Sequence, residues 1–340
     1  MTIVADLGEA QATLGRALRF DEYMQIALYG EHGFYTRGGT AGRRGDFITS
    51  PEVGPLFGAV VARWIDAEYE RLGRPDEFVV VECGAGPGTL ARSILLAAPQ
   101  WRHRYVAVEL SAAQRAKHPE GVQSLAELPS GPLTGVVLAN ELLDNLPFRL
   151  AVYDGGWREA WVEVGRDGSL SEQLTAASDW AWLPTGAAHG ARVPVQQGAG
   201  QWVGELVGER VGRLQAGALL VFDYCVPHTA ELAARPWRDW LRTYRGHERG
   251  GHYLRHPGEQ DITADVCVDQ LPGPDTVRSQ AQFLQRWGID ELVEEGRVAW
   301  DAAAGRPDLA ALRMRSRVRE AESLLDPAGL GSFLALEWHR

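Results

Sequence analysis

The sequence predicts an α/β protein built on a doubly wound, Rossmann-like sheet. Two observations carry this prediction: short continuous apolar runs alternate with segments of helical periodicity, and a glycine-rich turn joins the first run to a helix. Continuous apolar runs are typical of strands that are buried on both faces of a parallel sheet. The expected strands are residues 78–82, 104–109, 136–139 and 218–223.

The segment before the sheet, residues 1–75, is expected to form helices and loops that cover the ligand cleft. Residues 10–30 have apolar positions at helical spacing, and the glycine-rich stretch that follows is too polar for a core element. Ser50 and Pro51 predict a helix start in which Ser50 is the cap and Pro51 is the first helical residue. A helix over residues 56–72 then presents one apolar face.

The turn after the first apolar run contains three glycines at alternate positions and follows an acid. A dinucleotide-binding turn would read G-x-G-x-x-G, but Thr89 stands where its third glycine would fall. A carboxylate before the glycines would repel a pyrophosphate, and it suits a ligand with a cationic amino-acid group such as S-adenosyl-L-methionine (SAM). A dehydrogenase is therefore disfavoured. We assign the methionine end of SAM to Glu82, Gly84, Ala85, Gly86 and Gly88.

A second acid, Glu109, ends the next apolar run, 21 residues after Gly88. A carboxylate at the end of a second parallel strand can accept both hydroxyls of a ribose. The alternative is an ordinary solvated glutamate at a strand end. We assign Glu109 to the ribose and Leu110 to the same site. Gln123 and Ser124, after an expected third strand, are assigned to the adenine.

The segment from Asn140 to Pro147 follows the third apolar run and carries two acids. Ligands of open α/β sheets bind at the carboxyl ends of the strands, which places Asn140 and Glu141 near the sulfonium of SAM. If Glu141 to Asp144 form a turn of helix, the two carboxylates share one face. Such a pair can hold a guanidinium by forked hydrogen bonds and accept its proton. The alternative is a polar loop that the proline ends.

The catalytic candidates are therefore Asn140, Glu141 and Asp144, with Asp46 and Glu52 as secondary candidates from the loop before the helix at 56–72. Asn140 is also a candidate for cofactor binding.

The rest of the chain predicts insertions in a core formed by residues 76–150 and 215–340. Residues 151–214 are read as one insertion, with a hairpin around Asp154-Gly155-Gly156 and a helix over 201–214. A second, irregular insertion is expected at about 244–280, and residues 309–325 predict a further helix.

Composition excludes several classes of function. The formal net charge of −11 argues against tight binding of nucleic acid, which needs a basic face. The three cysteines, Cys83, Cys225 and Cys267, lie far apart, so no metal spacing or disulfide framework is expected, and a reducing, cytoplasmic compartment fits. We expect no membrane span and no secretion signal, because no long apolar run and no signal-peptide pattern occur. The oligomeric state stays open, a homodimer included.

Several blocks in order resemble the MidA-like family of SAM-dependent methyltransferases. The blocks are residues 20–29, 33–35 and 45–52, the glycine turn, residues 140–147, Tyr244-Arg245-x-His247, residues 257–263, Gln282-Phe283-Leu284 and Leu324-Leu325-Asp326-Pro327. The resemblance implies a class I methyltransferase fold with a seven-stranded sheet, SAM as cofactor and S-adenosyl-L-homocysteine as product. It also implies a protein arginine as methyl acceptor, since mitochondrial members of the family methylate an arginine of a complex I subunit during assembly.

The sequence departs from the family pattern in two places. Asp265 stands where members often have histidine, and residues 250–256 differ from the Asp-Pro-Leu type of sequence. Both departures lie away from the glycine turn and concern the part that would meet the acceptor. Two alternatives therefore remain beside protein arginine methylation: methylation of a small molecule, and a SAM-binding assembly factor whose catalysis is dispensable.

Overall fold

The computed structural model describes residues 2–37, 49–208, 212–246, 248–303, 305–306 and 308–340. The chain forms two compact units, each made of three stretches of sequence. Unit 1 comprises residues 1–47, 142–208 and 224–273, and unit 2 comprises residues 48–141, 209–223 and 274–340. These limits differ from the predicted boundaries near 75, 150, 214 and 244–280. One reason is that helix α4 (Pro55–Arg71) contributes to the core of unit 2.

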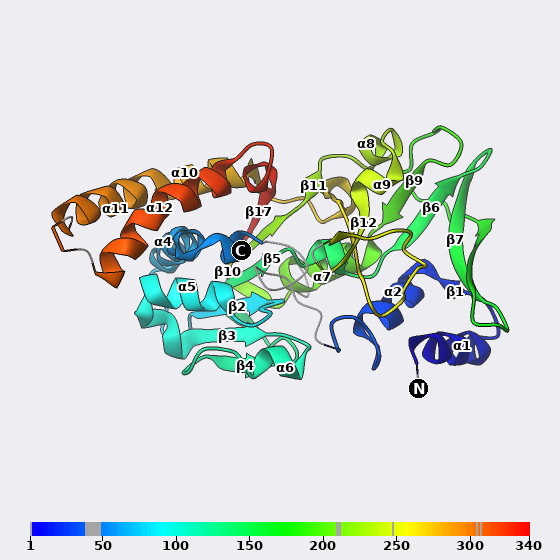
Figure 1. Ribbon diagram of the computed structural model, residues 1–340, viewed down its shortest axis with the longest axis horizontal. Coiled ribbons are helices and arrows are strands. Elements are labelled where there is room, and N and C mark those ends of the chain that lie inside the picture. The colour runs from blue at the N-terminus through cyan, green and yellow to red at the C-terminus, as the bar shows by residue number, and fades with distance from the viewer. Residues whose placement is uncertain (1, 38–48, 209–211, 247, 304, 307) are drawn as a thin grey trace. The chain divides into compact units, whose positions relative to one another are not determined.

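Unit 2 is built on a seven-stranded sheet (Figure 1) with the order β16-β17-β10-β5-β2-β3-β4. Strands β2, β3, β4, β5 and β10 are parallel, whereas β17 is antiparallel to both β10 and β16. The four predicted strands correspond to β2, β3, β5 and β10. The strands are β2 (Val79–Cys83), β3 (Tyr105–Val108), β4 (Gln123–Leu125), β5 (Leu133–Asn140), β10 (Leu214–Asp223), β16 (Thr276–Ser279) and β17 (Leu334–His339).

The strand order reverses direction between β2 and β5. From β2 the chain proceeds outward to β3 and β4, and it then returns to β5 on the other side of β2 and continues to β10. In open parallel sheets, ligands bind at the carboxyl ends of the strands at such a switch point. The fold of unit 2 therefore directs attention to the residues that follow β2, β3 and β5.

Helices pack on this sheet and bury its apolar side chains. Phe57 and Trp64 of α4 lie in one core cluster with Phe78, Trp101 and Phe222. The predicted helix at 309–325 is confirmed as α12 (Leu309–Leu325). The other helical elements of unit 2 are α3 (Ser50–Val53), α5 (Thr89–Ala97), η1 (Pro99–Arg104), α6 (Ala112–Arg115), α10 (Gln280–Arg286), α11 (Ile289–Ala303) and η4 (Leu330–Ser332).

The predicted cap at Ser50 is wrong. The N-cap of the short helix α3 is Thr49, and the Ser50 hydroxyl donates instead to Gln280 Oε1 at 2.8 Å. Gly54 then separates α3 from α4, and the first turn of α4 is capped from outside, because Glu320 Oε2 accepts the Leu56 N–H at 2.9 Å. A Cβ atom at Gly54 would lie 2.2 Å from the carboxyl carbon of Glu320, so a side chain there would displace the carboxylate that caps α4.

Unit 1 contains a five-stranded sheet in which β1, β7, β6 and β9 are neighbours in that order and β8 pairs with β7. The hairpin predicted around Asp154-Gly155-Gly156 is confirmed, since β6 and β7 pair across it with Tyr153 opposite Trp157. The strands are β1 (Leu18–Arg19), β6 (Arg149–Tyr153), β7 (Trp157–Val164), β8 (Leu170–Ala176) and β9 (Arg192–Val195).

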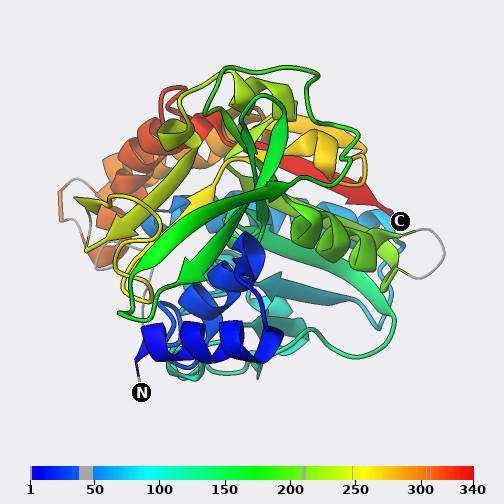
Figure 2. The same cartoon turned by 90° about the vertical axis from the view of Figure 1, so that its right-hand side faces the viewer.

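The single helix predicted over residues 10–30 is wrong. The chain forms two helices, α1 (Ile3–Leu14) and α2 (Phe20–Tyr29), because Gly15 takes a left-handed φ of 64° and ends α1. The residues between them form β1, which joins the edge of the sheet beside β7. Figure 2 shows α1 and α2 next to the long strand β7.

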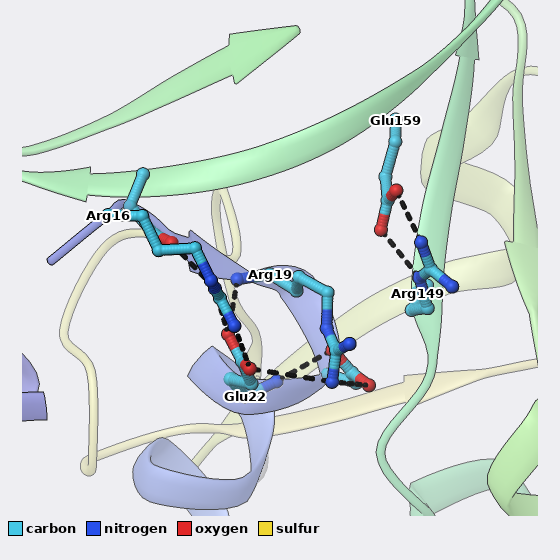
Figure 3. A network of polar contacts seen from close by, with 7 residues as sticks. Arg16, Arg19, Glu22, Arg149 and Glu159 are labelled. Atoms are coloured by element: carbon cyan, nitrogen blue, oxygen red, sulfur yellow. Dashed lines mark hydrogen bonds and ion pairs between the residues drawn. The ribbon is translucent and has the colours of Figure 1, made fainter. Parts of the chain in front are cut away.

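A polar network holds α2 and the sheet of unit 1 in place (Figure 3). The Arg16 guanidinium donates to both carboxylate oxygens of Glu22, at 2.7 and 2.8 Å. Arg149 of β6 forms a similar two-point contact with the buried Glu159 of β7, at 2.5 and 2.6 Å. Two-point contacts of this kind fix the orientation of both partners.

The remaining strands of unit 1 form two small sheets. One has the order β13-β12-β14, and the other pairs β11 with β15. The predicted irregular insertion at 244–280 thus contains regular strands. The predicted helix over 201–214 is shifted, because α7 ends at Val207 and β10 begins at Leu214. These elements are α7 (Gln197–Val207), α8 (Thr229–Ala233), α9 (Trp237–Trp240), η2 (Leu143–Asn145), η3 (Val268–Gln270), β11 (Cys225–Val226), β12 (Leu241–Arg245), β13 (Glu248–Arg249), β14 (Asp261–Ala264) and β15 (Val266–Cys267).

No helix among the described residues combines the length and the apolar character needed to cross a bilayer.

Candidate functional site

The glycine loop after β2 has a backbone that other residues would not readily adopt. Gly84, Gly86 and Gly88 have φ values of 68°, 52° and 79°, all in the left-handed region. The loop is anchored to the neighbouring strand because the Ala85 N–H donates to the Val108 carbonyl at 3.0 Å. A Cβ atom at Gly86 would meet nothing within 4 Å, so one side of the loop is open. The loop can therefore present its backbone to a ligand.

Glu109 lies directly after β3 and is held against this loop. Its Oε2 accepts the Gly86 N–H at 3.0 Å, and its Oε1 accepts the Ser111 N–H at 2.8 Å. Each carboxylate oxygen thus has one fixed backbone donor and further acceptor capacity. The side chain is half-buried, so a ligand can reach it. The arrangement suits the predicted role of Glu109, which is to accept two ribose hydroxyls.

The predicted adenine contacts need one correction. Gln123 and Ser124 were expected to follow a strand. They lie within one instead, because both belong to β4, which ends at Leu125. Both side chains are exposed. Leu110 is also exposed, by 63%, which is unusual for a leucine next to a strand end. An apolar side chain beside Glu109 is suited to packing against a flat base.

His118, which follows α6 in the chain, contacts the glycine loop, and sequence reasoning missed it. Its Nε2 lies 3.0 Å from the Gly86 carbonyl oxygen, and its Nδ1 lies 2.9 Å from Ser124 Oγ. A carbonyl can only accept, so Nε2 carries a proton, and the neutral ring then accepts from Ser124 through Nδ1. Burial lowers the pKa of His118, which favours this neutral form. His118 therefore links β4 to the glycine loop.

Glu82, the acid that precedes the glycines, is more deeply buried than the sequence suggested. Only 4% of the residue is exposed, and its Oε2 accepts the Tyr105 hydroxyl at 2.7 Å. Burial raises the pKa of Glu82 to about 7, although the bond from Tyr105 opposes this shift. The side chain packs within the sheet, and its predicted contact with the amino group of SAM stays a prediction.

Asn140 and Glu141 mark the end of β5, next to β2 at the switch point. The Asn140 side-chain nitrogen donates to Glu141 Oε1 at 3.2 Å. The Asn140 oxygen is buried and has no hydrogen-bond partner in the part of the chain that the structure describes. Glu141 has a φ of 51°, a left-handed conformation that costs a non-glycine residue about 1 kcal/mol or more. Such strain is typical of functional sites.

The predicted helical turn from Glu141 to Asp144 is wrong. Glu141 is not helical, and the short 3-10 helix η2 includes only the second acid. The two carboxylates therefore do not share a helix face. The physical reason is the hydrogen bond from the Glu141 N–H to the Phe222 carbonyl at 2.8 Å, which keeps Glu141 attached to the sheet beside β10.

Asp144 belongs to unit 1, where it joins a buried acid cluster. We define this cluster as Tyr29, Tyr35, Asp144, Asn145, Asp261 and Thr263. Asp144 is 2% exposed, and its Oδ2 accepts the hydroxyl of Thr263. Burial raises the pKa of Asp144, while the hydroxyl of Thr263 and the charge of Arg242 act in the opposite direction. The side chain is therefore suited to gain or lose a proton near neutral pH.

Asp261 is the second acid of the cluster, and sequence reasoning gave it no role. Its Oδ1 accepts from Tyr35 at 3.0 Å, from the Asn145 amide at 3.1 Å and from the Ile262 N–H at 2.9 Å. Its Oδ2 is buried and has no hydrogen-bond partner among the described residues. Burial and the nearby Asp144 raise the pKa of Asp261 to about 7. The only sequence signal was that Asp261 lies in the block at 257–263.

The two secondary candidates have different outcomes. Glu52 lies in unit 2 beside the glycine loop, since its Oε1 accepts the hydroxyl of Thr89, the first residue of α5, at 2.7 Å. Its position fits the cofactor loop better than a clamp on the acceptor. Asp46 lies outside the described residues.

The residues around the loop of unit 2 fit the adenosine and amino-acid parts of SAM. The open side of Gly86, the paired acceptors of Glu109 and the buried oxygen of Asn140 each match a group of that ligand. Among the described residues, no group of three or more histidine, cysteine, aspartate or glutamate side chains is arranged to hold a metal ion.

Comparison with known proteins gives consistent results. Residues 60–284, more than half of the chain, match a family model described as "Putative S-adenosyl-L-methionine-dependent methyltransferase". The protein arginine methyltransferase NDUFAF7 homologue of Drosophila melanogaster, a mitochondrial protein, is 30% identical over 72% of this chain. The NDUFAF7 protein of Danio rerio is 26% identical over 80% of this chain and 74% of its own length. This chain spans 63% of the length of the Drosophila relative.

A solved structure is similar over nearly the whole chain. It is a protein from Burkholderia thailandensis with S-adenosyl-homocysteine bound, and it shares 26% sequence identity and a TM-score of 0.82 with this chain. The similarity covers 99% of this chain and 92% of that one.

Proposed function

We propose that this chain, which belongs to the family of S-adenosyl-L-methionine-dependent methyltransferases, transfers the methyl group to an arginine side chain of a protein. The observation that carries the proposal is the pair of buried acids, Asp144 and Asp261, in unit 1. Two carboxylates are the groups that bind a guanidinium best. The names of the NDUFAF7 relatives, which are protein arginine methyltransferases, support the same acceptor.

Unit 2 would hold the cofactor. Bound SAM supplies a methyl group that its sulfonium makes electrophilic. Glu109 accepts the ribose hydroxyls, and the glycine loop receives the methionine tail. Glu52 and the oxygen of Asn140 are the acceptors that suit the ammonium group, because Glu52 bonds to the first residue of α5 and the Asn140 oxygen is buried at the end of β5.

Unit 1 would hold the acceptor. A guanidinium is protonated at neutral pH, so its nitrogen attacks a methyl carbon only if a carboxylate localises the charge and takes a proton. Asp261 Oδ2, which has no hydrogen-bond partner within the described ranges, and the raised pKa of Asp261 suit this side chain to accept that proton. Asp144 would hold the second edge of the guanidinium. Glu141 precedes Asp144 by three positions in the chain and is the remaining candidate for the clamp.

The test has two parts. Calorimetry with SAM and with NAD is expected to give saturable binding of SAM alone. Incubation of a cell lysate with the chain and SAM labelled in its methyl group is expected to label a protein band, and hydrolysis of that band should release methylated arginine. Label that enters only small molecules, or label on another amino acid, would contradict the arginine proposal. Binding without any transfer would favour an assembly factor.

Two glycine variants provide a matched control for the binding step. Gly86 and Gly155 both have positive φ, at 52° and 66°, and at both a Cβ atom would meet nothing within 4 Å. Gly86→Ala and Gly155→Ala therefore introduce similar backbone strain. Only Gly86→Ala should weaken SAM binding, by about tenfold or more, because its Cβ enters the space that the ligand needs. Equal affinities in the two variants would remove the loop from the cofactor site.

For localisation we propose a reducing compartment such as the cytoplasm. All three cysteines are free thiols, and Cys83 and Cys267 are buried. Burial raises the pKa of both buried thiols and makes them unreactive. Fractionation of the source cells with an antibody against the chain would test this directly.

A further inference from the structure

Unit 1 contains a cavity of about 540 Å³ that the proposed chemistry does not use. Four arginines line it, and we call it the arginine-lined cavity. The other lining residues include Glu172, Leu241 and His252. A concentration of guanidinium groups is unexpected in a chain with a formal net charge of −11. The lining arginines are Arg238, Arg242, Arg249 and Arg255.

The positive charge of this cavity is only partly neutralised from within. Arg242 pairs with Asp265 at 2.7 Å, and Glu172 pairs with Arg192 at 2.6 Å. For the other three lining arginines, the described residues offer no carboxylate within ion-pair distance. The three are Arg238, Arg249 and Arg255, and all are exposed.

Arg242 is the lining arginine that is held most firmly by the chain. A terminal nitrogen of Arg242, NH2, is buried and has no hydrogen-bond partner in the described part of the chain. The side chain of Arg242 is only 12% exposed, so bulk water reaches it poorly. Asp265 and this burial hold Arg242 in one position, so its guanidinium is a fixed positive charge in the wall of the cavity.

The walls of the cavity favour a polypeptide over a small ion. Leu170, Ser171 and Glu172 come from β8, which among the described strands pairs only with β7. An edge strand has unpaired backbone groups that an extended peptide can use. Gly250 and Gly251 add backbone without side chains, and the volume is in the range of sites for larger ligands.

We propose that the arginine-lined cavity binds an acidic segment of the protein that is methylated. The proposal rests on the proposed function for the view that the acceptor is a protein. It also gives a role to both places where the sequence departs from the family pattern. Residues 250–256 supply much of the lining, and Asp265 orients Arg242. The cavity would thus select the partner, while the buried acid cluster receives the arginine.

The experiment uses the full chain and a fluorescent twelve-residue peptide of glutamate, aspartate and glycine, without arginine. Fluorescence anisotropy is expected to show saturable binding that weakens as salt is added. Arg238→Gln combined with Arg255→Gln should weaken binding by about tenfold or more. Each substitution removes a positive charge, and the hydrogen bonds that glutamine can form with a carboxylate are weaker than those of a guanidinium. The matched control is Arg158→Gln with Arg166→Gln, two exposed arginines of unit 1 outside the cavity, and it should bind within about twofold of wild type.

Three results would overturn the proposal: no saturable binding, equal loss in both double variants, or displacement of the peptide by millimolar inorganic phosphate at constant ionic strength. The last result would assign the cavity to a small anion. Calorimetry with SAM and the lysate assay, run on the same variants, separate this inference from the proposed function. Normal SAM binding and protein labelling without peptide binding would remove only the cavity proposal, whereas loss of protein labelling by the wild-type chain would remove the proposed function.

Discussion

The acids of the two units are held in opposite ways. In unit 2, Glu109 is half-buried, and each of its oxygens accepts one backbone N–H, at 2.8 and 3.0 Å. In unit 1, Asp261 is fully buried, and one oxygen accepts three hydrogen bonds while the other has no partner among the described residues. The first arrangement holds both oxygens in fixed positions as acceptors. The second leaves one oxygen free to change its protonation.

This difference teaches that the environment of a carboxylate separates a binding role from a proton-transfer role. A carboxylate whose two oxygens each accept one backbone N–H is held in position and offers fixed acceptors to a ligand. A carboxylate in a buried, acidic environment has a pKa near neutrality, where general bases are most effective. Glu109 therefore suits ligand binding, and Asp261 suits catalysis.

The change expected to have the largest effect is Asp261→Asn. Asparagine keeps the oxygen that accepts from Tyr35, Asn145 and the Ile262 N–H, and it imitates the neutral acid in shape. It cannot accept a proton, so the rate of methyl transfer should fall by about a hundredfold or more, which is typical for loss of a general base. Transfer of labelled methyl into protein, measured at saturating SAM, would show the loss.

SAM affinity provides the control for this variant, because Asp261 lies in unit 1 and the cofactor residues lie in unit 2. Calorimetry should give the same dissociation constant for Asp261→Asn and wild type. A rate within about threefold of wild type would exclude Asp261 as the proton acceptor. The buried acid of unit 1 would then have no role in proton transfer.

A smaller effect is expected from Glu109→Gln. Glutamine has one oxygen, so either the Gly86 or the Ser111 N–H loses its acceptor, and a ribose hydroxyl loses one as well. Hydrogen bonds to a charged group are worth about 1.5–3 kcal/mol, so SAM should bind roughly ten- to a hundredfold more weakly. Glu77→Gln, an exposed glutamate of the same unit, makes the same change of charge and should leave the affinity unaltered. Equal affinities in both variants would argue that the ribose lies elsewhere.

The sequence predicted the architecture of unit 2 better than the chemistry of unit 1. Apolar runs gave β2, β3, β5 and β10, and the family comparison confirms the family, the class I fold and SAM as the cofactor. These features depend on short stretches of chain, in which apolar pattern and glycine positions are directly readable.

The acid cluster depends on contacts between distant parts of the sequence. Asp261 bonds to Asn145, which is 116 positions away, and to Tyr35, which is 226 positions away. No local pattern encodes such a meeting. The left-handed backbone of Glu141 was also unpredictable, because the sequence favours a helical turn there and the bond to Phe222 from another strand prevents it. Local rules therefore fail where tertiary contacts override them.

The smallest expected effect tests whether burial alone can give an acid a neutral pKa without a catalytic role. Glu82 is buried in unit 2 and has its pKa raised from 4.5 to about 7. Between these values the folded state binds a proton that the unfolded state has released, so the stability of wild type falls as the pH rises.

Glu82→Gln keeps an acceptor for the Tyr105 hydroxyl and does not titrate. Between pH 5.5 and 6.5, wild type should lose about 1 kcal/mol of unfolding free energy relative to Glu82→Gln, since one pH unit in this window corresponds to 1.36 kcal/mol. Urea unfolding followed by tryptophan fluorescence at both pH values measures this difference. A difference that stays constant with pH would mean that Glu82 is ionised in the folded chain, which would restore it as a direct partner for the cationic end of SAM.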